Sequence, residues 1–84
     1  MAVHTLDARG SACPMPIVKT AQAIKTIPSG GLIEVLATDP GSVKDFAAWS
    51  RTTGNELVEQ TTDSGVFRFV LRRKRGESHD YPDP

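Results

Sequence analysis

The feature that most restricts the fold of this chain is an alternation between two spacings of its apolar residues. Four segments are predicted to form β-strands, at residues 3–8, 32–38, 55–62 and 66–73, and in the first, second and fourth of them the residues alternate between two faces. Between the first three of these segments, residues 14–27 and the stretch from Pro40 to about Gly54 show helical spacing. The sequence therefore predicts the order strand, helix, strand, helix, strand, strand.

Local signals set the expected ends of the two helices. Pro, Ser, Gly and Gly at residues 28–31 end the first helix. Asp39 and Pro40 begin the second, because the Asp39 carboxylate can accept a backbone amide and Pro40 loses no hydrogen bond in a first turn. Ser42 with Asp45 three residues later offers a competing cap.

The same spacing indicates how the layers pack. Ile17, Ala21, Ile24 and Ile27 share one face of the first helix, which we expect to be buried. Right-handed strand–helix–strand crossovers can put both helices on the same face of one four-stranded sheet. We therefore expect an α+β fold, a two-layer sandwich, in which the other sheet face is partly wet.

Charge is unevenly distributed along the 84 residues. Ten Lys and Arg balance ten Asp and Glu, which argues against a strongly basic nucleic-acid module and an acidic disordered chain. Residues 76–84 hold three of the acids and no cation, so we interpret them as a disordered tail after a domain at residues 1–75. The sequence shows no membrane-spanning segment and no signal peptide, and we expect a cytoplasmic monomer.

Cys13 is the single cysteine, which excludes an internal disulfide and a multi-cysteine zinc site, and no metal or cofactor is expected. Pro14 biases Cys13 away from helical geometry, so Cys13 is predicted to cap the first helix, with Pro14 and Pro16 inside its first turn. A helix N-terminus favours a thiolate, to which Arg9 and Lys19 could add positive potential. A buried, inert cysteine is the alternative.

At these residues the chain resembles the TusA/SirA family of small sulfur-carrier proteins. The resemblance rests on Leu6 to Gly10, on Cys13-Pro14-Met15-Pro16 followed by Lys19, on Asp39-Pro40, and on the strand that begins at Asn55-Glu56-Leu57. It implies the strand order 1-2-4-3 in a mixed sheet, with the fourth strand antiparallel to the rest. It also implies that Cys13 carries the sulfur. Asp7, Arg9, Gly10, Pro14, Pro16 and Lys19 then form the supporting motif.

The resemblance further implies a persulfide carrier rather than a stand-alone enzyme of multiple turnovers. Cys13 would accept a sulfane sulfur from a donor of the cysteine desulfurase or rhodanese type. It would then pass that sulfur to a cysteine of an acceptor sulfur-relay protein, in tRNA thiolation, molybdenum-cofactor assembly or sulfur oxidation. A lone cysteine suits this role, because a second nearby thiol could release the sulfur by forming an internal disulfide.

Two alternatives remain open from the sequence. One is a regulatory, partner-binding domain in which Cys13 is structural or redox-sensing, and the other is an RNA-binding domain. Direct nucleic-acid binding is not expected, given the zero net charge and few aromatic residues. One basic run is either a solvated strand end or a docking patch for an acidic partner. It consists of Arg72, Arg73, Lys74 and Arg75.

Overall fold

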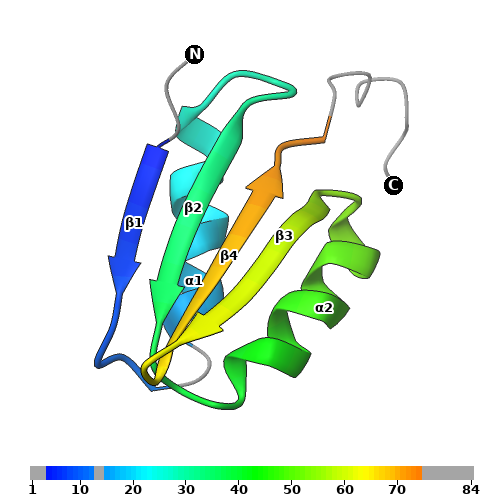
Figure 1. Cartoon of the computed structure of the whole chain (residues 1–84). Coiled ribbons are helices and arrows are strands. Elements are labelled where there is room, and N and C mark those ends of the chain that lie inside the picture. Colours follow the sequence, from blue (N-terminus) through cyan, green and yellow to red (C-terminus); the bar gives the residue numbers. More distant parts are fainter. Residues whose placement is uncertain (1–3, 13–14, 75–84) are drawn as a thin grey trace.

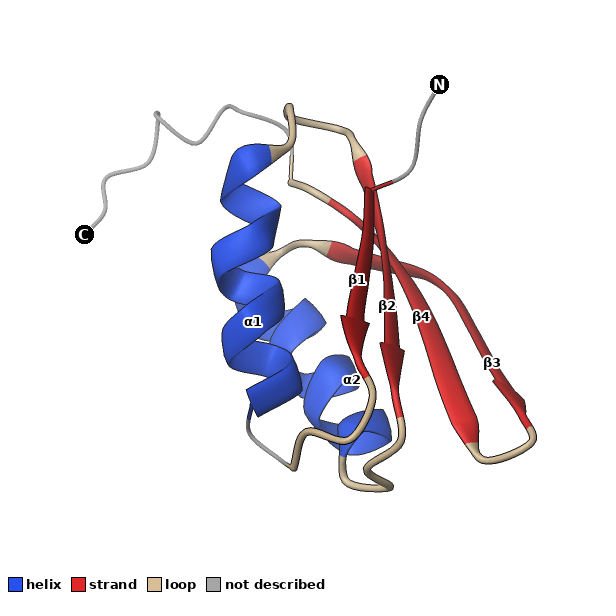
Figure 2. Ribbon diagram, turned by 90° about the vertical axis from the view of Figure 1, so that its left-hand side faces the viewer, coloured by secondary structure: helices blue, strands red, loops and turns tan. Residues whose placement is uncertain are grey.

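Four strands pair into one mixed sheet, and both helices lie against one face of that sheet (Figures 1 and 2). The structure is a computed structural model, and it describes residues 4–12 and 15–74. The elements are β1 (His4–Ala8), α1 (Met15–Ala23), the 3-10 helix η1 (Ile24–Thr26), β2 (Leu32–Ala37), α2 (Ser42–Thr53), β3 (Glu56–Asp63) and β4 (Val66–Arg72).

The sheet order is β1-β2-β4-β3. Strand β1 runs parallel to β2, whereas β4 runs antiparallel to both of its neighbours, β2 and β3. The expected α+β sandwich and the implied strand order are therefore confirmed. The register places Ala8 beside Ala37 at one end of the sheet and Leu32 beside Arg72 at the other. These two ends carry the two groups of residues that the sequence singled out.

The core fills the space between the helices and the sheet. Phe46 of α2 stacks on Phe69 of β4 with ring centroids 4.5 Å apart, and the edge of Trp49 meets Phe46 at 6.3 Å. Offset and edge-on ring contacts of this kind stabilise a core beyond the area they bury. The buried apolar cluster consists of Ala8, Ile24, Ile27, Ile33, Val35, Ala37, Phe46, Phe69 and Leu71.

The buried face of the first helical segment matches the prediction at Ile24 and Ile27 but differs from it within α1. Pro16 and Thr20 are fully buried, whereas Ile17 and Ala21 are only half-buried. The Thr20 hydroxyl donates a 2.8 Å hydrogen bond to the carbonyl oxygen of Pro16, so its burial leaves no polar atom unsatisfied. The α-helix also ends earlier than predicted, at Ala23, because the chain tightens into η1 before Pro28.

Helix α2 begins at Ser42, two residues after the predicted Pro40. The Asp39 carboxylate accepts a 3.0 Å hydrogen bond from the backbone amide of Gly41, but Gly41 itself is the N-cap and no side chain caps the helix, so the predicted capping by Asp39 is wrong. The competing cap at Ser42 is wrong, because its hydroxyl oxygen is buried and has no hydrogen-bond partner among the described residues. The helix ends at Thr53, and Gly54 follows it as the C-cap in the left-handed conformation at φ +84°, close to the predicted end.

The face of the sheet away from the helices carries a row of polar contacts that crosses all four strands. Thr5 of β1 donates a 3.0 Å hydrogen bond to Glu34 of β2, which also pairs with Arg68 of β4. Arg68 in turn pairs with Glu59 of β3 at 3.0 Å. The Arg68 guanidinium lowers the pKa of Glu34 below its ordinary value. This face mixes charged and apolar residues, as the sequence predicted.

Within residues 4–12 and 15–74, no helix combines the length and the apolar character needed to cross a membrane. The division into a domain at residues 1–75 and a tail at residues 76–84 stays a prediction. Residues 75–84 lie outside the described part of the chain.

Candidate functional site

The predicted supporting residues gather where β1 ends and α1 begins, at the lower end of the sheet in Figure 2. Cys13 and Pro14 lie outside the described residues, so the predicted N-cap stays a prediction. The residues on either side of this pair are held to each other, since the backbone amide of Met15 donates a 2.8 Å hydrogen bond to the carbonyl oxygen of Ala12. We define the chain between β1 and Cys13, residues 9–12, as the cysteine loop.

Asp7 and Arg9 form a closed ion pair at the start of the cysteine loop. Two guanidinium nitrogens of Arg9 donate to the two carboxylate oxygens of Asp7, each at 2.8 Å, and the Arg9 backbone amide donates at 3.1 Å. These hydrogen bonds from Arg9 lower the pKa of Asp7 from 3.8 to about 2. Because Asp7 balances the charge of Arg9, the pair shapes the turn more than it supplies positive potential.

Gly10 fixes the cysteine loop to a neighbouring part of the chain. Its backbone amide donates a 2.9 Å hydrogen bond to the hydroxyl of Thr38, which follows β2. Its φ is +83°, and the position that a Cβ atom would occupy has no other atom within 4 Å. Glycine is therefore favoured here by backbone conformation rather than by lack of space.

Lys19 brings a positive charge back to the cysteine loop from the second turn of α1. Its Nζ atom donates a 2.9 Å hydrogen bond to the hydroxyl of Ser11, whose amide donates at 3.2 Å to the carbonyl oxygen of Ala8. Among the described residues, no carboxylate lies within the 4.0 Å ion-pair distance of Lys19. The Lys19 charge contributes to the lowered pKa of Asp7, so it acts across the loop.

The first turn of α1 presents both a buried and an exposed side. Pro16 is fully buried against the core and, lacking a backbone N–H, leaves no donor unsatisfied. Met15 and Val18 point to solvent, with 43% and 38% of their surface exposed. Met15 and Val18 thus form an exposed apolar pair at the N-terminal end of α1, next to the cysteine loop.

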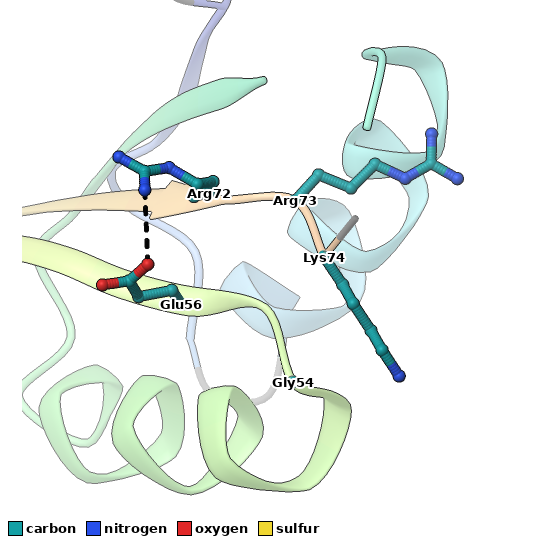
Figure 3. Close-up of a pocket in the computed structure, with 5 residues that line it drawn as sticks. All are labelled: Gly54, Glu56, Arg72, Arg73 and Lys74. Carbon is teal, nitrogen blue, oxygen red and sulfur yellow. Dashed lines mark hydrogen bonds and ion pairs between the residues drawn. The ribbon is translucent and has the colours of Figure 1, made fainter. Parts of the chain in front are cut away.

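The described part of the basic run, Arg72 to Lys74, lies at the opposite end of the sheet, and its side chains diverge (Figure 3). Arg72 faces Glu56 at 3.4 Å, whereas Arg73 donates to the carbonyl oxygens of Ile27 at 2.5 Å and Lys25 at 3.4 Å. The stem of Lys74 lies over Gly54. Arg72, Arg73 and Lys74 line a cavity of about 200 Å³ together with Gly54 and Glu56.

This divergence weakens the case for the run as one docking patch, although docking at the run stays a prediction. Arg75 lies outside the described residues. Among the described residues, no group of three His, Cys, Asp and Glu side chains is placed to hold a metal ion.

Known proteins match this chain over most of its length. The family model described as Sulfurtransferase TusA matches residues 4–73, which is nearly all of the described chain. This chain belongs to the TusA family.

Individual TusA-family relatives agree with the family model. The chain is 46% identical over 68 residues to the sulfur carrier protein TusA of Allochromatium vinosum, covering 81% of this chain and 90% of that protein. It is equally similar, over 68 residues, to the putative sulfur carrier protein YrkI of Bacillus subtilis, at 81% and 91% coverage. A crystal structure of a SirA-like protein from Desulfitobacterium hafniense shares the fold, with a TM-score of 0.74 at 22% identity. This structural match covers 88% of the present chain and all of the SirA-like protein.

Within this TusA-family chain, the structure brings together Asp7, Arg9, Gly10 and Lys19 around the cysteine loop, with Pro16 buried beside it. The sequence did not identify Thr38 as the anchor of Gly10, nor Ser11 as the partner of Lys19. No local pattern marks either residue. A serine followed eight residues later by a lysine becomes a contact only when the helix turns back past the loop.

Proposed function

We propose that this TusA-family protein is a sulfur carrier that holds a sulfane sulfur as a persulfide on Cys13. One observation carries the proposal: the only cysteine of the chain falls between the anchored cysteine loop and the first turn of α1. The family match over residues 4–73 supports the carrier role. The names of its relatives, sulfur carrier proteins, support it as well.

The proposed chemistry needs no oxidant or reductant from outside. The Cys13 thiolate attacks the outer sulfur of a donor protein's persulfide, a new S–S bond forms on Cys13, and the donor's S–S bond breaks. The donor's thiolate leaves, and Cys13 now carries the sulfur as a persulfide. A thiolate of the acceptor protein then attacks the outer sulfur, and Cys13 departs as a thiolate. Two thiol proteins, one donor and one acceptor, are therefore the required partners.

The described residues supply what such a carrier needs around its thiol. Anions are favoured near a helix N-terminus, and α1 begins two residues after Cys13. The Lys19 ammonium, bonded to Ser11, lies on the loop that leads to Cys13. Hydrogen bonds from Arg9, Gly10 and Ser11 restrain that loop. A restrained loop limits the motion of the nucleophile during a transfer between two proteins.

An intact-mass measurement tests the proposal. The protein is incubated with a cysteine desulfurase or a rhodanese that already carries a persulfide. We expect one sulfur atom to be added to the wild type, to be removed by a reductant, and to be absent from Cys13→Ser. Circular dichroism of Cys13→Ser provides the control for folding. A Cys13→Ser chain that still gains a sulfur atom contradicts the proposal, and a wild type that gains none favours the regulatory or RNA-binding alternatives.

A further inference from the structure

Apart from Arg73 and Lys74, which follow β4, the described cations fall into two groups, one at the sheet and one in the helix layer. The sheet group is ion-paired: Arg68 with Glu34 and Glu59, and Arg72 with Glu56. Arg9, just after β1, is paired with Asp7. Exposed pairs of this kind add little to stability, but they cancel the field of each arginine.

The helix layer has the opposite character. Helices α1 and η1 carry Lys19 and Lys25 and no carboxylate, and α2 carries Lys44 and Arg51 against Asp45. Lys25, Lys44 and Arg51 are exposed, and no described carboxylate lies within 4.0 Å of any of the three. Lys44 and Arg51 are seven residues apart, which places them on the same side of α2. We call the solvent side of α1, η1 and α2 the helix face.

The helix face also has an apolar region at one end. Met15 and Val18 are exposed on α1, three residues apart and therefore neighbours on the helix surface. This end adjoins the cysteine loop. In the helix layer the aromatic rings are turned inward, because Phe46 is fully buried and Trp49 packs against it. Trp49 is half-buried, so the described helix face has no fully exposed ring on which a nucleic-acid base could stack.

We propose that the helix face is a docking surface for an acidic protein surface. Both helices lie on the same side of the sheet (Figure 2), so the field of their cations extends over one face of the molecule. An acidic partner would be attracted to this face and repelled by the carboxylate-rich opposite face. The apolar pair Met15 and Val18 provides a desolvated contact beside the cysteine loop. The identity of the partner as a sulfur-relay protein rests on the proposed function, whereas the charge preference does not.

Nuclear magnetic resonance can test the helix face without any sulfur chemistry. The full chain is labelled with ¹⁵N in a Cys13→Ser background and titrated with deca-glutamate at low ionic strength. We expect amide shifts to concentrate around Lys25, Lys44 and Arg51 and to shrink when salt is added. We expect Arg51→Glu to weaken binding about fivefold, since it reverses an unpaired charge.

The matched control is Arg72→Glu, the same substitution on the sheet face, which we expect to weaken binding less than about twofold. Equal weakening by the two variants, or amide shifts concentrated on the strands, would overturn the proposal. A ten-nucleotide oligouridine provides the comparison with RNA. If it binds more tightly than deca-glutamate under the same conditions, the helix face is assigned to RNA instead. Because Cys13 is absent from every sample, the outcome is independent of the mass assay for sulfur loading.

Discussion

Lys19 and Ser11 join α1 to the cysteine loop through a 2.9 Å hydrogen bond from the ammonium Nζ to the hydroxyl Oγ. This contact delivers a positive charge to the loop two residues before Cys13, without a described carboxylate at ion-pair distance. By contrast, Arg9, the other cation of the predicted motif, is balanced by Asp7. Lys19 is thus the described cation best placed to favour an anionic sulfur on Cys13.

The first prediction concerns this charge. Lys19→Met keeps the aliphatic stem and removes the ammonium, so we expect a smaller thiolate fraction at neutral pH and alkylation of Cys13 by iodoacetamide about two- to fivefold slower. The rate is followed by intact mass. Lys25→Met, which removes a cation from η1 at the far end of α1, is the matched control. Equal slowing in both variants would mean that only the net charge matters.

The second prediction concerns Asp7, whose pKa falls from 3.8 to about 2 in the folded chain. Because the folded-state pKa is the lower one, ionised Asp7 contributes stability above pH 3.8, and that contribution is lost as the pH falls through about 2. We therefore expect the difference in unfolding free energy between wild type and Asp7→Asn to be constant near neutral pH. It should be smaller at about pH 3.

Urea unfolding at the two pH values measures this difference. Asp63→Asn is the control, since Asp63 lies in the exposed hairpin and its carboxylate accepts a 3.3 Å hydrogen bond from Ser64 rather than from a cation. A difference between wild type and Asp7→Asn that does not change with pH would show that Arg9 does not hold Asp7 ionised.

The order of the elements was predictable because two periodicities separate cleanly along this chain. On β4, Phe67, Phe69 and Leu71 alternate with Arg68, Val70 and Arg72, and the structure turns the first three side chains toward the core. The burial of Thr20 was missed, because a threonine in an amphipathic pattern counts as polar unless its hydroxyl is satisfied locally. Here the carbonyl oxygen of Pro16 accepts its hydrogen bond.

The candidate site was predictable only where its contacts are local. Asp7 and Arg9 belong to the predicted motif and are only two residues apart, so their ion pair needs no contact between distant parts of the chain. The contact between Gly10 and Thr38 spans 28 residues and requires β1 and β2 to end side by side. Such a contact depends on strand pairing, and the sequence around Gly10 or Thr38 contains no local pattern that predicts it.

The third prediction uses two glycines with nearly equal conformations. Gly10 and Gly65 have φ of +83° and +80°, and both have open space where a Cβ would stand. We expect Gly10→Ala and Gly65→Ala each to lower the unfolding free energy by about 1 to 2 kcal/mol, because a left-handed backbone is strained for alanine. Only Gly10→Ala should also slow sulfur loading, since only Gly10 lies in the cysteine loop. Equal loading rates would show that the loop conformation does not matter for transfer.

The fourth prediction separates structural from docking roles in the basic run. Arg73 donates to the carbonyl oxygens of Lys25 and Ile27, which end the first helical segment, whereas Arg72 makes one exposed pair with Glu56. Arg73→Met should lower the unfolding free energy by about 1 kcal/mol, because it leaves carbonyl groups without their donor. Arg72→Met should change it by less than about 0.5 kcal/mol.

Thermal unfolding measures these stability effects. Docking is measured separately by the rate of sulfur loading from a protein donor, at a temperature where all variants are folded. We expect Arg72→Met to load at the wild-type rate, because its charge is already paired with Glu56 and lies at the end of the sheet opposite the cysteine loop. Loading that slows in Arg72→Met while its stability is unchanged would instead assign partner docking to this end of the sheet. The helix face would then not be the sole docking surface.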